Sequence, residues 1–132
     1  MDLVRYYASK KDTLLEVNTF KELIKEVVES DLLIGSSLAS FLNSYAWRMS
    51  ELNTNLEDAL KKSNESINLI ETMDIEIQKR KPMLLDTKAE ILWKMGNIEE
   101  AIIIINQAIE LESENQYYKD QKTKFQNSKK GN

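Results

Sequence analysis

The chain has 132 residues and a net charge of −4 at pH 7, and it contains neither cysteine nor histidine. Without these two residue types it has no disulfide, no thiol nucleophile, no histidine general base and none of the common zinc or haem ligand sets. Its hydrophobic fraction of 42%, with only three glycines and one proline, indicates a single globular domain over residues 1–132, built from helices and not from a turn-rich sheet.

Residues 1–36 are predicted to form N-terminal helices. The stretch from residue 2 to residue 10 is amphipathic. A second helix is expected to begin at the capping box Thr19–Glu22, where the threonine and glutamate side chains each satisfy a free backbone amide. This helix should end near Asp31, and Gly35 marks a break in the chain. A degenerate helix hairpin is one interpretation of the whole segment.

Residues 37–81 are predicted to form the next pair of helices. A serine at the start of this segment caps a helix that reaches about Leu52. A second capping box, Thr54–Glu57, begins an extended second helix that ends between Met73 and Lys79.

Residues 82–112 are predicted to form another hairpin. Pro82 suits a first helical turn because its missing N–H group has no partner there, and Gly96 fits a left-handed helix stop. The apolar residues of Ile98–Leu111 follow the helical i, i+3, i+4, i+7 rule. The isoleucine run inside this segment would suit a strand on its own, but the longer pattern favours a helix. The chain then has two further predicted segments: a capping helix, residues 113–128, and a polar tail, residues 129–132.

Two segments of the chain repeat each other with an offset of 42 residues. Ala101 follows Ala59 by this distance, and Ala108 follows Ser66 by the same distance. Small residues at a helix crossing let the two helix axes approach to about 8 Å. A hairpin of two helices cannot hide its apolar stripe alone, so we expect neighbouring hairpins to stack.

This pattern resembles that of the tetratricopeptide (TPR) repeat family. Residues 37–72 match weakly, because Ser63 and Ser66 stand where bulkier apolar and alanine residues are typical. The two repeats are also separated by about eight residues more than the usual repeat length of about 34 residues. The resemblance implies an all-α fold of antiparallel hairpins, stacked as a short TPR-like solenoid with flanking and capping helices, that acts as a protein-binding scaffold. Residues 82–115 match best, through Leu85, Ala89, Leu92, Gly96, Ala101, Ile105 and Ala108.

A narrower resemblance concerns the sequence from Asn43 to Trp47 together with that from Leu84 to Ala89. Both are similar to helical-repeat regions appended to some bacterial thioredoxin-like proteins. This resemblance implies a structural appendage of a larger protein, and a self-assembling homo-oligomer is a further alternative to a module that binds other proteins. We expect a cytoplasmic protein if Met1 is the native start, and a periplasmic one if the chain is excised from a secreted parent.

No motif for catalysis or cofactor binding stands out. The three glycines are isolated, which excludes a glycine-rich phosphate loop, and carboxylate pairs such as Glu99–Glu100 fit solvated helix ends. The basic run Lys79–Lys81 fits a charged link between helices. We therefore expect a protein that is not an enzyme and that binds no cofactor or metal. Its acidic charge and short apolar runs also argue against nucleic acid and membrane partners.

The TPR resemblance also implies a binding site, because the first helix of each hairpin lines a concave groove in that family. Tryptophans supply large contact areas in such grooves. The carboxylates of Asp86 and Glu90, one helical turn apart, favour a basic or neutral peptide over an acidic one. A competing interpretation places Trp47 and Trp93 in the core. The implied groove residues are Asn43, Trp47, Ser50, Met83, Asp86, Glu90, Trp93 and Lys94.

Overall fold

The computed structural model describes residues 3–130, and it describes side chains for residues 10–129. Over this range the chain is all-helical and contains no strand, as the composition predicted. None of the described helices is long and apolar enough to cross a lipid bilayer. The chain divides into two compact units, Met1–Ile34 and Gly35–Asn132, and each is described by itself.

The first unit contains one long helix, α1 (Leu3–Glu29). The predicted helix start at Thr19 was wrong, because α1 runs through this position without a break. No glycine or proline interrupts the helix, so nothing forces the residues before the threonine out of the helical conformation. The helix ends through Asp31, which has a left-handed φ of 52°, and the Leu32 N–H donates to the Val27 carbonyl at 3.1 Å. Apart from residue 10, the amphipathic pattern predicted for residues 2–10 lies outside the described side chains.

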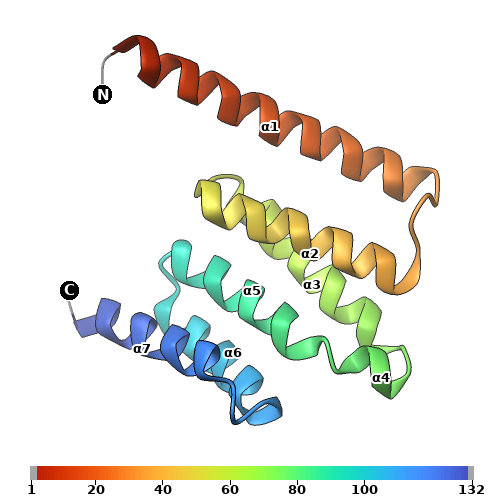
Figure 1. Cartoon of the computed structure of the whole chain (residues 1–132), viewed down its shortest axis with the longest axis vertical. Coiled ribbons are helices and arrows are strands. Elements are labelled where there is room, and N and C mark those ends of the chain that lie inside the picture. Colours follow the sequence, from red (N-terminus) through yellow and green to blue (C-terminus); the bar gives the residue numbers. More distant parts are fainter. Residues whose placement is uncertain (1–2, 131–132) are drawn as a thin grey trace. The chain divides into compact units, whose positions relative to one another are not determined.

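The second unit contains two hairpins and a final helix (Figure 1). Helix α5 packs against both helices of the first hairpin, α2 and α3, and α7 packs against α6. In Figure 1, α2, α5 and α7 run in one direction, while α3 and α6 run in the opposite direction. We call α2, α5 and α7 the first helices. The helices of this unit are α2 (Gly35–Leu52), α3 (Leu56–Glu71), α4 (Ile75–Gln78), α5 (Lys81–Lys94), α6 (Ile98–Leu111) and α7 (Gln116–Lys130).

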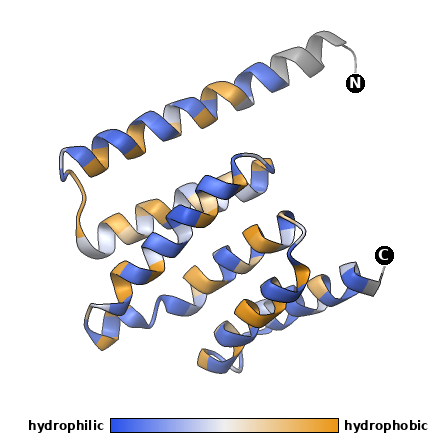
Figure 2. Cartoon of the chain, turned by 180° about the vertical axis from the view of Figure 1, so that it is seen from behind, coloured by the Kyte–Doolittle hydropathy of each residue, from blue (hydrophilic) through white to orange (hydrophobic). Residues whose placement is uncertain are grey.

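Small residues lie where the helices of each hairpin cross. Apolar and polar residues alternate along these helices (Figure 2), and the alanines of the repeated pattern all face the interior. The Ser66 hydroxyl is also buried and donates to the Ala39 carbonyl of the facing helix at 2.7 Å. The segment Ile98–Leu111 is helical, so the prediction of a helix over a strand is confirmed. The fully buried alanines are Ala46, Ala59, Ala89, Ala101 and Ala108.

The extra residues between the two hairpins form a separate turn of helix. The predicted extension of the second helix beyond residue 73 was wrong, because α3 ends at Glu71. Asp74 starts α4 instead: its carboxylate accepts a hydrogen bond from the Ile77 N–H at 3.1 Å. A side chain that caps a new helix competes with continuation of the old one, which explains the break.

The start of α3 differs from the prediction, whereas the glycine stop after α5 agrees with it. The predicted capping box at Thr54 was wrong, because Asn55 is the N-cap of α3 and makes no side-chain cap bond. Its amide donates instead to the Tyr45 hydroxyl, which donates to the Asp58 carboxylate at 2.6 Å. Gly96 has a φ of 87°, and the next N–H donates to the Leu92 carbonyl at 2.9 Å, so the predicted left-handed stop is confirmed.

Candidate functional site

Six of the eight residues implied as a groove fall into two sets with an offset of 43 residues. On α5, Asp86, Glu90 and Trp93 all face α7, as the contacts below show. The positions 43 residues earlier, on α2, are Asn43, Trp47 and Ser50. Because α5 packs against α2, and α5 contacts α7 through Asp86, Glu90 and Trp93, we assign both sets to the sides of the first helices that face the next first helix.

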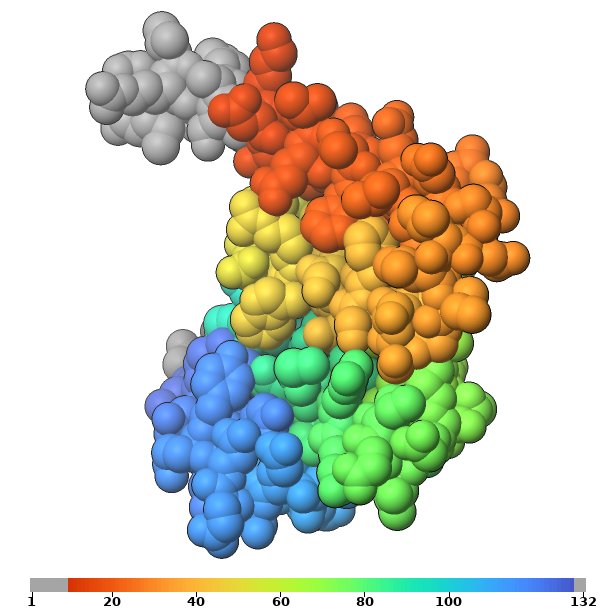
Figure 3. Space-filling model, turned by 45° about the vertical axis from the view of Figure 1, so that its right-hand side comes forward, coloured from red at the N-terminus to blue at the C-terminus, as the bar shows by residue number. Residues whose placement is uncertain are grey.

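The junction of α5 and α7 is a polar cluster, which we call the α5–α7 seam. In the space-filling view of Figure 3, the blue surface of α7 adjoins the green to teal surface of α5. The Gln121 amide nitrogen donates to the Asp86 carboxylate at 3.1 Å and to the Glu90 carboxylate at 2.9 Å. All three side chains are buried. The seam consists of Asp86, Glu90 and Trp93 on α5 and Gln121, Lys124, Phe125 and Ser128 on α7.

Lys124 links the charged part of the seam to its aromatic part. Its ammonium group lies 2.8 Å from a Glu90 carboxylate oxygen and 4.3 Å from the centre of the Trp93 ring. The Trp93 indole N–H donates to the Ser128 hydroxyl at 2.9 Å, and its ring lies 5.7 Å from the Phe125 ring. Residues later in α5 contact residues later in α7, so the two helices are parallel.

The seam contains more negative than positive charge. Two carboxylates, Asp86 and Glu90, face one ammonium group, that of Lys124. The pKa of Asp86 is raised to about 6, by burial first and also by the Glu90 charge, against the lowering effects of the Gln121 bond and the Lys124 charge. The pKa of Tyr117 is also raised, by burial first and then by the charges of Asp86 and Glu90. The Tyr117 phenol therefore lies near the acidic pair.

On α2, the implied groove residues are largely covered. Ser50 is 1% exposed and its hydroxyl donates to the Trp47 carbonyl at 2.6 Å, so this serine is closed to a ligand. Trp47 itself is partly exposed. Among the described side chains, the Asn43 amide oxygen is buried without a hydrogen-bond partner. The α2 set thus contains one aromatic surface and one unsatisfied acceptor.

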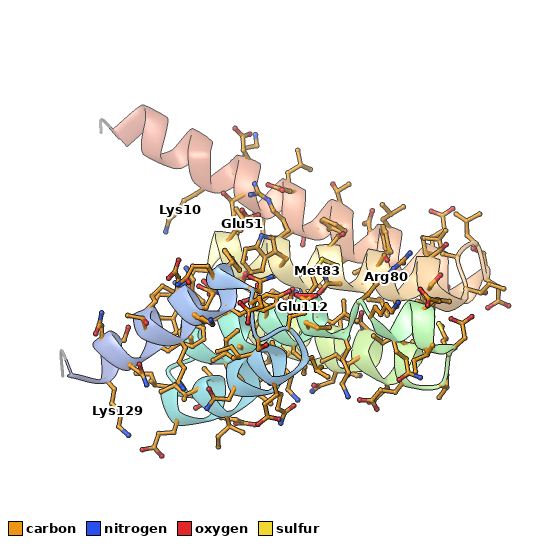
Figure 4. The ribbon with its side chains drawn as sticks, turned by 60° about the horizontal axis from the view of Figure 1, so that its bottom comes forward. Lys10, Glu51, Arg80, Met83, Glu112 and Lys129 are labelled. Atoms are coloured by element: carbon orange, nitrogen blue, oxygen red, sulfur yellow. The ribbon has the colours of Figure 1, made fainter. Side chains whose placement is uncertain are left out.

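Two large apolar side chains remain open on the first helices. Met83 on α5 is 49% exposed and Tyr117 on α7 is 51% exposed. Met83 lies about one helical turn before Asp86, and Tyr117 lies about one turn before Gln121. Because Asp86 and Gln121 are hydrogen-bonded and the two helices are parallel, Met83 and Tyr117 lie at the same level along α5 and α7. We call the exposed surface of Met83 and Tyr117 the first-helix face. In Figure 4, Met83 is labelled on α5.

Several of the other charged residues named from the sequence have partners in the structure. Lys94 is partly buried, with its ammonium group 5.6 Å from the centre of the Trp93 ring. In the basic run, Lys79 pairs with Glu76 and Lys81 pairs with Glu71, both at 3.1 Å, as a charged link between helices would. Lys129, labelled in Figure 4, pairs with Glu99 at 2.7 Å. Within the described residues no acidic group has the arrangement of a metal site.

The α7 half of the seam was missed from the sequence. The spacing of Gln121, Lys124 and Phe125 places all three on one side of a helix, and this was the available signal. The α7 face opposite the seam and α6 is polar. Its exposed residues include Lys119, Asp120, Thr123, Gln126 and Asn127.

Comparisons with known proteins return no relative. No family model, no curated protein and no solved structure matches the chain.

Proposed function

We propose that the chain is a non-catalytic protein-interaction module whose helix hairpins stack as a short TPR-like solenoid. Three features support the proposal: the parallel first helices, the packing of α5 against both helices of the preceding hairpin, and the buried alanines at the helix crossings. Stacked hairpins bury a continuous core in this way and leave one side of the first helices available to a partner.

The first-helix face is the binding surface in this proposal. The observation that carries it is the exposure of Met83 and Tyr117, each about half open on neighbouring helices. Methionine and aromatic side chains are enriched at protein interfaces because they offer large, adaptable contact areas. The partner is an apolar, uncharged peptide segment, since the nearby carboxylates already bond to Gln121 and Lys124.

Selection from a displayed peptide library on the full chain tests this function. Peptides that bind the native chain should lose at least about tenfold in affinity with Met83→Lys, because the ammonium group interrupts the apolar surface. Ile103→Lys is the matched control, since Ile103 is comparably exposed, at 58%, but lies on α6. An equal effect of both variants, or no selected peptide, would contradict the proposal.

Self-assembly is the alternative use of the same face. Sedimentation of the native chain and of Met83→Lys at several concentrations separates the two functions. Association of the native chain that Met83→Lys abolishes would assign the first-helix face to a second copy. A monomer in both cases, with peptide binding intact in the native chain, would support a partner of another sequence.

A further inference from the structure

Helix α7 is held to the rest of its unit by few buried side chains. Among its described residues only Tyr118, Gln121 and Phe125 are buried, and one of these is an amide. Burial of apolar area is the main stabilising contribution to helix packing. Elements with few buried apolar contacts open most readily in native proteins. We therefore expect α7 to detach more easily than α5 or α6.

Helix α7 is also an imperfect match for the α5 surface that it covers. Asp86 accepts its hydrogen bond from the neutral amide of Gln121, whereas Glu90 pairs with the ammonium group of Lys124. A cation in place of the neutral amide would add direct charge attraction to the Asp86 carboxylate, which the Gln121 bond does not supply. The raised pKa of Asp86 is consistent with a buried carboxylate that lacks a cation of its own. The α5 surface therefore has room for one more positive charge.

An arginine at the position of Gln121 would complete this charge balance. The Gln121 nitrogen lies 3.1 Å from Asp86 and 2.9 Å from Glu90, so a donor at this position reaches both carboxylates. A guanidinium group carries five N–H donors in a planar fork and stays charged at neutral pH. A helix with arginine here and lysine one turn later would fit the acidic pair better than α7 does.

We propose that Asp86 and Glu90 on α5 form a recognition site for a basic amphipathic helix of a partner protein, and that α7 occupies this site until such a helix displaces it. The partner helix presents arginine, lysine and an aromatic residue at i, i+3 and i+4, the spacing of Gln121, Lys124 and Phe125. This site rests on the proposed function, since it makes the chain a protein-binding module. Its acidic pair lies outside the first-helix face, although Tyr117 of that face moves with α7 when α7 is displaced.

A dye-labelled peptide with the sequence of residues 113–130 and Gln121→Arg serves as the probe. Its fluorescence anisotropy is measured with the full chain at pH 7. We expect it to bind at least about tenfold more tightly than the same peptide with the native glutamine, because of the added ion pair. A peptide with glutamate in place of both Gln121 and Lys124 should not bind. Equal binding of the acidic peptide would overturn the proposal.

Variants of the full chain test the site itself. Asp86→Asn should weaken binding of the arginine peptide by about tenfold, whereas Asp120→Asn, on the exposed side of α7, should leave it unchanged. Gln121→Arg in the full chain should strengthen the packing of α7 on α5 and prevent binding of the peptide. Unchanged affinity in Asp86→Asn would overturn the proposal.

A variant in which α7 is held less tightly tests whether a tightly packed α7 is the reason for any absence of peptide binding. Lys124→Met removes the ion pair to Glu90 and should admit the arginine peptide more easily than the native chain does. If this variant keeps its helical circular dichroism and still binds no peptide, α7 is a fixed part of the fold and the proposal fails. That result leaves the first-helix face untouched, because its test uses Met83→Lys and unrelated peptides.

Discussion

Asp86 is a carboxylate whose burial makes it a source of instability at neutral pH. Its pKa rises from an ordinary value of 3.8 to about 6 in the folded chain, mainly because burial disfavours the charged form. A raised carboxylate pKa means that the folded state binds the proton more tightly than the unfolded state. The contribution of this group to stability is therefore lost as pH rises from about 4 through 6.

Asp86→Asn should consequently stabilise the chain at pH 7. The asparagine oxygen can still accept the Gln121 bond, while the buried charge disappears. We expect the free energy of unfolding to rise by up to about 3 kcal/mol at pH 7, and the gain to shrink by about half at pH 5. Urea denaturation at both pH values measures this, with Asp120→Asn as the exposed control. A gain independent of pH would show that the charge is not the cause.

Ser63 and Ser66 form a natural pair for measuring what a buried hydroxyl contributes. Both are buried on α3, but Ser66 donates to the Ala39 carbonyl whereas the Ser63 hydroxyl has no partner among the described residues. Ser66→Ala should lower the free energy of unfolding by about 1 kcal/mol, and Ser63→Ala should leave it unchanged or raise it by about 1 kcal/mol. Thermal unfolding compares them directly. Equal losses in both variants would refute this account.

At the scale of the helices, local sequence signals were reliable where the backbone geometry of a single residue decides the structure. Pro82 lies in the first turn of α5 and Gly96 follows the end of α5, as predicted, because backbone geometry alone decides these positions. The capping box at Thr54 failed because the Asn55 amide bonds to Tyr45, ten residues away in sequence. Capping rules take no account of such a tertiary partner.

Part of the candidate site was predictable from the sequence, and part was not. The acidic pair on α5 and its one-turn spacing were visible in the sequence, and so was its position on a first helix. Its burial under α7 was not, because it depends on Gln121 and Lys124, more than 30 residues away in sequence. Local periodicity gives the face of a helix, whereas the element that covers this face is set by the stacking of the hairpins.

Gly96 allows a test of the backbone contribution in isolation. Its φ of 87° is unfavourable for side chains, yet an added Cβ would meet nothing within 4 Å. Gly96→Ala should therefore lower stability by about 1 kcal/mol through the backbone alone, and Gly96→Asn should lower it less, because asparagine tolerates left-handed conformations. Thermal melts followed by circular dichroism measure the order. An alanine variant as stable as the native chain would contradict this interpretation.

At the scale of the molecule, the second unit has a hydrophobic core of its own. This core draws on residues from Ala39 to Phe125, and so on both hairpins and α7. The fragment of residues 35–132 should therefore unfold in one cooperative transition. Trp47 and Trp93 report on different hairpins, so single-tryptophan versions made with Trp47→Phe or Trp93→Phe should give the same fluorescence midpoint as circular dichroism. Separate midpoints would mean that the hairpins unfold independently.

The polar outer side of α7 has an evolutionary consequence. Because α7 packs against α6, buries Tyr118 and Phe125, and exposes hydrophilic residues on its other side, it can close whichever hairpin precedes it. A duplicated copy of residues 75–111, inserted before α7, would give this helix the same surface to pack against. Gene duplication could thus lengthen the protein one hairpin at a time, without any redesign of its end.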